Sequence, residues 1–240
     1  MRKLAAAATL IAATLPSAAC SRDRAEDGGP MVSRNFSVGN FSKIEVGGNF
    51  DVDVRTGAKP SVEVRASEAL LERLEVEVHG DELTIKSRRK GWFGGWGSHG
   101  KGQIHITVPS LTAATLAGAG EMRIDKVQGD AFEGQIAGSG DLSVGAVQVK
   151  QLKLGIAGAG SAQAAGKAER AEYEIAGSGD VKVGGLDAQD VKVSIAGSGN
   201  VNGRATRTAR VDIAGSGDVE LAGGAKCDVH KAGSGNVRCS

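Results

Sequence analysis

The segment Ile136-Ala137-Gly138-Ser139-Gly140-Asp141-Leu142 decides the fold, because the chain repeats it with small changes. Its central motif, Ala-Gly-Ser/Ala-Gly, occurs seven times at spacings of 20, 20, 19, 20, 18 and 18 residues. The motif begins at Ala117, Ala137, Ala157, Ala176, Ala196, Ala214 and Ala232. A nearly constant period of this length is typical of a solenoid or another stacked array.

Apolar and polar residues alternate on both sides of the motif. The second residue after the motif is apolar in all seven repeats, and apolar residues also alternate in the segment before it. Two such segments contain Leu152, Leu154 and Ile156, and Val191, Val193 and Ile195. Alternation with a period of two predicts strands with one buried face. Each repeat is therefore expected to hold short strands joined at corners, where glycine permits a positive φ.

These repeats predict an all-β fold, a single-domain parallel β-helix with about 18–20 residues per coil. A unit of this length is too short for a four-stranded propeller blade, which takes about 40 residues. The chain has only eight aromatic residues, which suits a narrow core of small stacked side chains. An antiparallel array of hairpins, with Gly-Ser-Gly-Asp as the turn, is the alternative.

Residues 36–110 lack the motif but show the same alternation, for example in Phe50–Val54 and Gln103–Val108. We interpret them as irregular first coils that continue into the later ones. The domain then spans residues 36–240. A boundary between two domains near Pro109 is the alternative, because the composition shifts there.

One segment in this region predicts a helix instead of a strand. Ser67 can cap its start, and Leu70, Leu71 and Leu74 form an apolar stripe at helical spacing. We expect this helix to span residues 67–74.

Residues 1–20 predict a secretory signal peptide. The start is positively charged, Leu4–Leu15 is an apolar run, and Ser17–Ala19 is a small-residue cleavage region. Cys20 follows directly, at the place where a bacterial lipoprotein carries its lipid. Ordinary secretion is the alternative, because such signals usually have Leu where this chain has Ser17.

Residues 21–35 show no periodicity and predict a flexible, polar tether between the membrane and the domain. The expected location is therefore the cell envelope. A lipoprotein anchored to the outer membrane fits the signal best, and a periplasmic or exported protein is the alternative.

Charge and composition exclude several classes of function. Lys and Arg number 29 against 28 Asp and Glu, so the chain is too nearly neutral to bind nucleic acid through bulk charge. The four histidines are scattered, and neither His-Glu-x-x-His nor Cys-x-x-Cys occurs, so we expect no metal site and no cofactor. No catalytic motif emerges, and the chain is predicted not to be an enzyme.

The residue after each motif is mostly Asp or Asn, which raises a calcium hypothesis. Stacked coils would align these side chains in a ladder of oxygens, the ligands that calcium prefers. The ladder would contain Asp141, Asp180, Asn200, Asp218 and Asn236. The alternative is that each side chain bonds to backbone amides at its corner.

Cys227 and Cys239 both occupy places that face inward in the other repeats. A disulfide between them would close the final coil, which no further coil covers. Their separation of 12 residues implies about 3 kcal/mol of stabilisation. Two small buried thiols are the alternative.

The segment from Lys86 to Lys101 holds both tryptophans and five Lys or Arg residues without an acid. It is predicted to be a long loop between two strands. Its candidate binding residues are Arg88, Arg89, Lys90, Trp92, Phe93 and Trp96. Such a set can enter an anionic lipid surface, or stack on the sugars of an envelope glycan. The alternative is a ring cluster that covers an open part of the solenoid.

The segment Phe41–Val52, the segment Ile106–Leu111 and the Ala-Gly-Ser-Gly-Asp coils together resemble the head GIN domain family of putative auto-transporter adhesins. The resemblance covers roughly residues 36–240. It implies a β-helical protein of the bacterial envelope, and it supplies no catalytic residues. The chain shows no translocator barrel of its own.

The function expected from these features is a non-enzymatic adhesin or interaction module of the cell envelope. Its expected partners are the membrane, through a lipid anchor, and an envelope glycan, anionic lipid or another envelope protein. The alternatives are a periplasmic polysaccharide-active enzyme on the same fold and a calcium-binding repeat protein.

Overall fold

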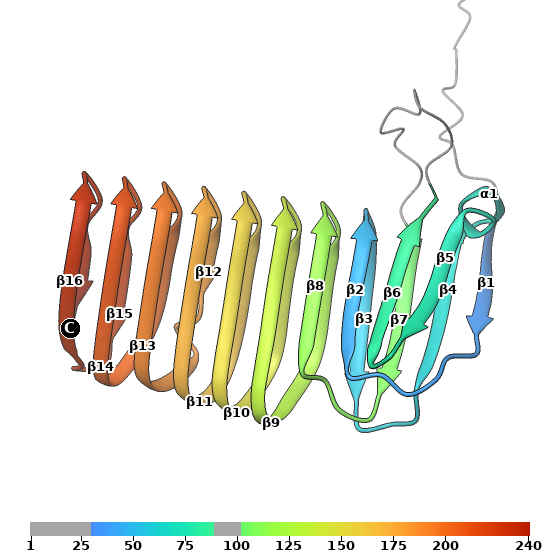
Figure 1. The fold of residues 1–240 in the computed structure, drawn as a ribbon, viewed down its shortest axis with the longest axis horizontal. Coiled ribbons are helices and arrows are strands. Elements are labelled where there is room, and N and C mark those ends of the chain that lie inside the picture. Colours follow the sequence, from blue (N-terminus) through green and yellow to red (C-terminus); the bar gives the residue numbers. More distant parts are fainter. Residues whose placement is uncertain (1–29, 89–101) are drawn as a thin grey trace, which may run out of the picture.

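The computed structural model describes residues 30–88 and 102–240, which form a continuous β-sheet wound into a solenoid of about six turns (Figure 1). The first elements are β1 (Met31–Phe36), β2 (Lys43–Gly48), β3 (Phe50–Thr56), β4 (Ser61–Ser67), α1 (Glu68–Leu71), β5 (Leu74–His79), β6 (Glu82–Ser87), β7 (Gly102–Val108) and β8 (Ala113–Gly118). The repeats form β9 (Glu121–Gly138), β10 (Asp141–Gly158), β11 (Ser161–Gly177), β12 (Asp180–Lys182), β13 (Leu186–Gly197), β14 (Asn200–Gly215), β15 (Val219–Ala222), β16 (Lys226–Gly233) and β17 (Val237–Cys239).

The solenoid has two long faces, because each coil bends once in its middle and once at its glycine motif. The first face runs in the order β5, β6, β2, β8, the second halves of β9, β10 and β11, then β13, the second half of β14, and β16. The second face runs in the order β1, β4, β7, β3, the first halves of β9, β10 and β11, then β12, the first half of β14, β15 and β17.

Successive coils pair in parallel throughout the repeats, which confirms the predicted parallel β-helix. The alternative of stacked hairpins is wrong for this region. Antiparallel pairing occurs only at the N-terminal end of the described chain, between β1 and β4, β4 and β7, and β5 and β6. One hydrophobic cluster runs from Phe41 to Leu221, so residues on both sides of Pro109 share a core.

The glycine motif forms a tight corner that stacks on the corner of the preceding coil. Gly177 has a φ of +132°, and a Cβ atom on it would overlap the carbonyl oxygen of Gly158. That oxygen accepts a hydrogen bond from the backbone N–H of Ser178 at 2.9 Å. The same pair of features recurs at Gly138 and Gly197. Glycine is therefore required here by its conformation and by the close approach of the neighbouring backbone.

The core consists of columns of like side chains stacked along the solenoid. One column contains Ile136, Ile156, Ile175, Ile195 and Ile213, all buried. The coil of β11 departs from this uniformity, because four of its inward residues are alanines. Tyr173 belongs to the same coil and is fully buried, with its ring near Gly203 of β14. Its hydroxyl has no hydrogen-bond partner among the described residues, and burial raises its pKa.

Two sequence predictions at the N-terminal end are wrong. The tether was expected to continue to residue 35, but Met31–Phe36 forms β1, which pairs along its whole length with β4. The helix is shorter than expected: α1 has four residues, Ser67 makes no side-chain cap bond, and Leu74 begins β5. Leu70 and Leu71 are buried as predicted, and α1 contacts β4 and β1.

The C-terminal coil differs from the coils beneath it. The column of isoleucines ends at Lys231, whose Nζ donates a hydrogen bond to the carbonyl oxygen of Gly235 at 2.7 Å. Cys227 stacks on Ala209 of the first face, and Cys239 stacks on Leu221 of the second face. The disulfide between Cys227 and Cys239 therefore joins the two faces across the interior.

We predict that Gly177→Ala destabilises the protein much more than Gly129→Ala. Both glycines have nearly the same φ, +132° and +139°, so both substitutions introduce about 1–3 kcal/mol of backbone strain. Only Gly177 also lies against the backbone of another coil, whereas Gly129 has open space around its missing Cβ. Urea unfolding monitored by circular dichroism measures the difference. Equal losses of stability at both sites would show that the close approach at the corner contributes nothing.

We also predict that Cys227 and Cys239 resist alkylation in the unfolded, non-reduced protein. Peptide mass mapping should find the peptides that contain these residues joined, and free after reduction. Reduction should lower the free energy of unfolding by about 3 kcal/mol, because it releases a closed loop of 12 residues. Alkylation of both thiols without reductant would contradict this.

Candidate binding face

The first face carries three rows of outward-facing side chains, because alternate residues of each strand point outward and successive strands are in register. The charged row contains Lys43, Ala113, Glu133, Lys153, Glu172, Lys192, Arg210 and Asp228. The middle row contains Glu45, Thr115, Gln135, Gly155, Glu174, Ser194, Asp212 and His230. The small row contains Gly47, Ala117, Ala137, Ala157, Ala176, Ala196, Ala214 and Ala232.

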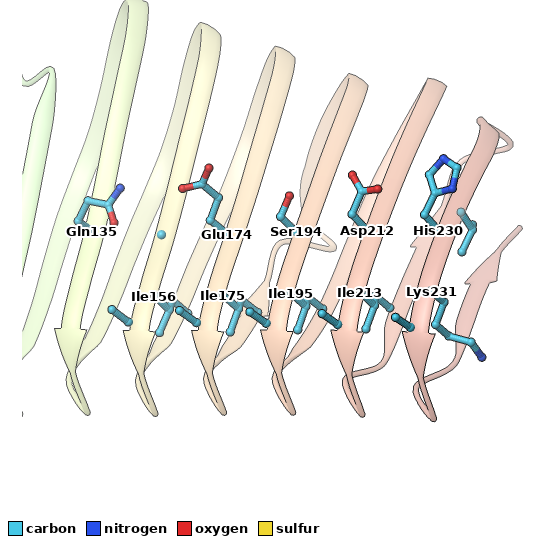
Figure 2. A pocket seen from close by; sticks show the side chains of 17 residues that line it. Gln135, Ile156, Glu174, Ile175, Ser194, Ile195, Asp212, Ile213, His230 and Lys231 are labelled. Atoms are coloured by element: carbon cyan, nitrogen blue, oxygen red, sulfur yellow. The ribbon is translucent and has the colours of Figure 1, made fainter.

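A shallow trough of about 840 Å³ lies over the middle and small rows. Figure 2 shows Gln135, Glu174, Ser194, Asp212 and His230 in one line, and Gly155 of β10 lies between Gln135 of β9 and Glu174 of β11. The methyl groups of the small row leave space beside this line. The trough therefore combines a flat apolar strip with a line of hydrogen-bonding groups.

A second trough of about 1120 Å³ lies on the other side of the charged row and extends from Lys43 to Asp228. Arg170, Asp190 and Lys226 line it, together with the charged row. The two troughs thus flank a ridge of long charged side chains. The whole first face, rather than one enclosed pocket, is the candidate site.

Charged side chains on this face form ion pairs with charged side chains on neighbouring strands. Lys192 Nζ lies 2.6 Å from Glu172 Oε1, and Lys153 Nζ lies 3.1 Å from Glu174 Oε2. These hydrogen bonds raise the pKa of both lysines. Hydrogen bonds from Arg207 and Thr208 lower the pKa of Asp190 to about 2. Lys192, Lys153 and Asp190 are therefore fully charged at neutral pH.

The pKa shifts do not resemble those of a catalytic acid or base. Within residues 30–88 and 102–240, every carboxyl group with a shifted pKa is shifted downward, at Glu75, Asp130 and Asp190. A general acid that works near neutral pH needs a raised carboxyl pKa. Glu75, Asp130 and Asp190 are therefore held in the charged form at neutral pH.

The predicted ladder of Asp and Asn residues lies on the second face and bonds to itself. Asn200 Nδ2 donates to Asp180 Oδ1 at 3.0 Å, and the backbone N–H of Asn236 donates to Asp218 Oδ1 at 2.7 Å. No group of three or more His, Cys, Asp or Glu residues in the described part of the chain could hold a metal ion. The geometry thus favours the structural interpretation of this ladder over calcium binding.

Most of the predicted binding loop lies outside the described residues, including Arg89, Lys90, Trp92, Phe93 and Trp96. Cys20 lies outside them as well. Arg88 is described, and its Nε lies 2.6 Å from Glu75 Oε1 at the edge of the first face. The described residues contain no helix long and apolar enough to cross a membrane.

The rows of the first face were not identified as a candidate site from the sequence. One signal for them was present in the sequence, because Ala recurs at the start of every motif although this strand position is exposed in six of the seven repeats and half-buried at Ala117. Strand propensity does not explain this, since Ala is depleted in strands. The charge alternation from Glu133 to Lys192 becomes visible only when the coils are stacked in register.

Comparison with known proteins identifies relatives of the fold. Residues 40–225 match a family described as "Putative auto-transporter adhesin, head GIN domain". A crystal structure of a putative adhesin from Bacteroides fragilis superposes with a TM-score of 0.80 at 20% identity, covering 89% of this chain and 99% of that one. A search of curated proteins finds no match.

Two further crystal structures come from Parabacteroides. A putative lipid binding protein from Parabacteroides distasonis gives a TM-score of 0.71 at 24% identity, covering 89% of this chain and 98% of that one. A putative adhesin from Parabacteroides merdae gives 0.69 at 19% identity, covering 88% and 97%. At these identities the likeness shows the shared solenoid fold.

Proposed function

Because this chain belongs to the head GIN domain family of putative auto-transporter adhesins, we propose that it is a non-enzymatic, adhesin-like binding module of the bacterial cell envelope. The first face is the observation that carries this proposal. It presents long rows of side chains at a regular spacing of roughly 4.8 Å along the solenoid. Its charges are stably paired, and the described carboxyl groups with shifted pKa values are poor proton donors at neutral pH.

Sequence features support an envelope location with a lipid anchor at Cys20. The signal peptide in residues 1–20 directs the chain out of the cytoplasm, and Cys20 stands at its end. The disulfide between Cys227 and Cys239 fits an oxidising compartment. We propose that the mature chain is held at the outer membrane by this lipid.

The strand that follows the anchor segment, β1, and the two strands that flank the loop, β6 and β7, lie at the same end of the solenoid. Strand β1, the end of β6 and the start of β7 all belong to the N-terminal end (Figure 1). A lipid on Cys20 would keep this end near the membrane. We therefore propose that the loop between β6 and β7 contacts anionic lipid headgroups or an envelope glycan.

We predict that Cys20→Ser abolishes metabolic lipid labelling and releases the protein from the membrane fraction. Without the thiol, no thioether can form and the lipid cannot be attached. Cell fractionation beside the wild type measures both effects. Retention of label and membrane association in the variant would contradict the anchor.

We predict that replacing Trp92, Phe93 and Trp96 by Ser reduces binding to anionic vesicles or to purified envelope glycan several-fold, with little change in melting temperature. Neutral vesicles provide the control surface, because they offer the rings an interface without attracting the basic residues. Vesicle co-sedimentation and glycan pull-down separate the two ligands. A large drop in melting temperature with unchanged binding would show that the loop is structural.

A further inference from the structure

We propose that the first face is an interface between two copies of this chain. The two copies pack face to face about a two-fold axis that runs parallel to the strands, midway between β10 and β11. Under this axis β10 lies opposite β11 of the partner, β9 opposite β13, β8 opposite β14, and β2 opposite β16. Strands β5 and β6 extend beyond the partner. The inference rests on the proposed function, because it names a second copy as the partner of the first face. The axis sets the N-terminal ends of the two copies at opposite ends of the dimer, and the argument from the face does not depend on the membrane anchor.

The charged row is self-complementary under this axis. Lys153 meets Glu172, Glu133 meets Lys192, and Lys43 meets Asp228 of the other copy. Since the axis repeats each contact, the row makes six opposite-charge contacts. Arg210 meets Ala113, so no like charges oppose each other in this row.

The charges also favour one position of the two-fold axis along the solenoid. An axis shifted to lie between β11 and β13 would place Lys153 against Arg210 and Glu133 against Asp228, which are like-charge pairs. Like-charge contacts across an interface oppose association strongly. Only the central axis combines full overlap of the repeats with opposite charges.

The other two rows fit the same arrangement. In the small row, Gly47 and alanines meet alanines, so no bulky side chains oppose each other there. In the middle row, Glu45 meets His230 and Gln135 meets Ser194, so hydrogen-bonding groups face each other. This arrangement also covers the strip of exposed methyl groups, which a free face leaves in water.

The area is sufficient for a stable dimer. Eight strands at about 4.8 Å and roughly seven residues of width at about 3.3 Å give about 900 Å² per copy. A standard stable interface buries about 800 Å² per partner.

The second face lacks this complementarity. Its outermost row places Asp51, Glu121 and Asp141 on consecutive strands. The equivalent axis on that face would set Glu121 against Asp180. The second face therefore provides a matched control for every test of the first.

The first test is cross-linking of the full chain in detergent. Ala137 and Ala196 lie opposite each other across the proposed axis, so Ala137→Cys/Ala196→Cys with a short bifunctional thiol reagent should give a covalent dimer. Ser143→Cys/Asn202→Cys provides the control pair, with the same strand separation on the second face. No excess of dimer over this control would overturn the proposal.

The second test is a charge swap measured by analytical ultracentrifugation. Wild type should sediment at twice the mass of one chain. Glu133→Lys and Lys192→Glu should each raise the dimer dissociation constant at least about tenfold, and the double variant should restore it to near wild type.

Recovery of the wild-type dissociation constant in the double variant would show that Glu133 of one copy contacts Lys192 of the other. Within one chain the two residues are three strands apart, roughly 14 Å, beyond the screening length of about 8–10 Å. Lys182→Glu on the second face should leave the dissociation constant unchanged. A monomeric wild type, or a double variant as weak as the single ones with circular dichroism unchanged, would overturn the proposal.

Discussion

The carbonyl oxygen of each corner glycine is the point on which the solenoid depends. At Gly158 it accepts the N–H of Ser178 and lies where a Cβ atom of Gly177 would be. The corner thus holds adjacent coils in register and excludes every side chain. Differences in coil length must be absorbed elsewhere. The register shifts between Val144 and Val147, and between Ala188 and Asp190, both occur away from the motif, toward the opposite bend.

Fixed register has opposite consequences inside and outside the solenoid. Inside, it stacks like upon like, so that isoleucine follows isoleucine in the buried column from Ile136 to Ile213. Outside, stacking like upon like would place equal charges about 4.8 Å apart, which is unfavourable. The alternation from Glu133 through Lys153 and Glu172 to Lys192 avoids this repulsion. The same alternation makes the first face complementary to itself.

The repeats could be predicted from the sequence because their signals are local. Alternation and glycine corners are visible within 20 residues, and the parallel β-helix follows from them. The N-terminal end could not be predicted in this way. Met31–Phe36 forms a strand only because β4 lies beside it, and Leu74 leaves the helical stripe to begin β5. The candidate face depends on contacts between residues 19–20 positions apart, so it became apparent only after the register was known.

The two ends of the solenoid differ in structure. At the N-terminal end, β1 is the edge strand of the second face and pairs with β4, and α1 contacts both of these strands. At the C-terminal end, Lys231 takes the place of isoleucine in the buried column, and its ammonium group donates a hydrogen bond to the carbonyl oxygen of Gly235. The equivalent carbonyl oxygens of Gly140 and Gly160 accept a backbone N–H of the next coil. A lysine at an open edge opposes the addition of another strand. Growth along the axis is therefore disfavoured at this end, so the two long faces remain as surfaces through which the described chain can associate.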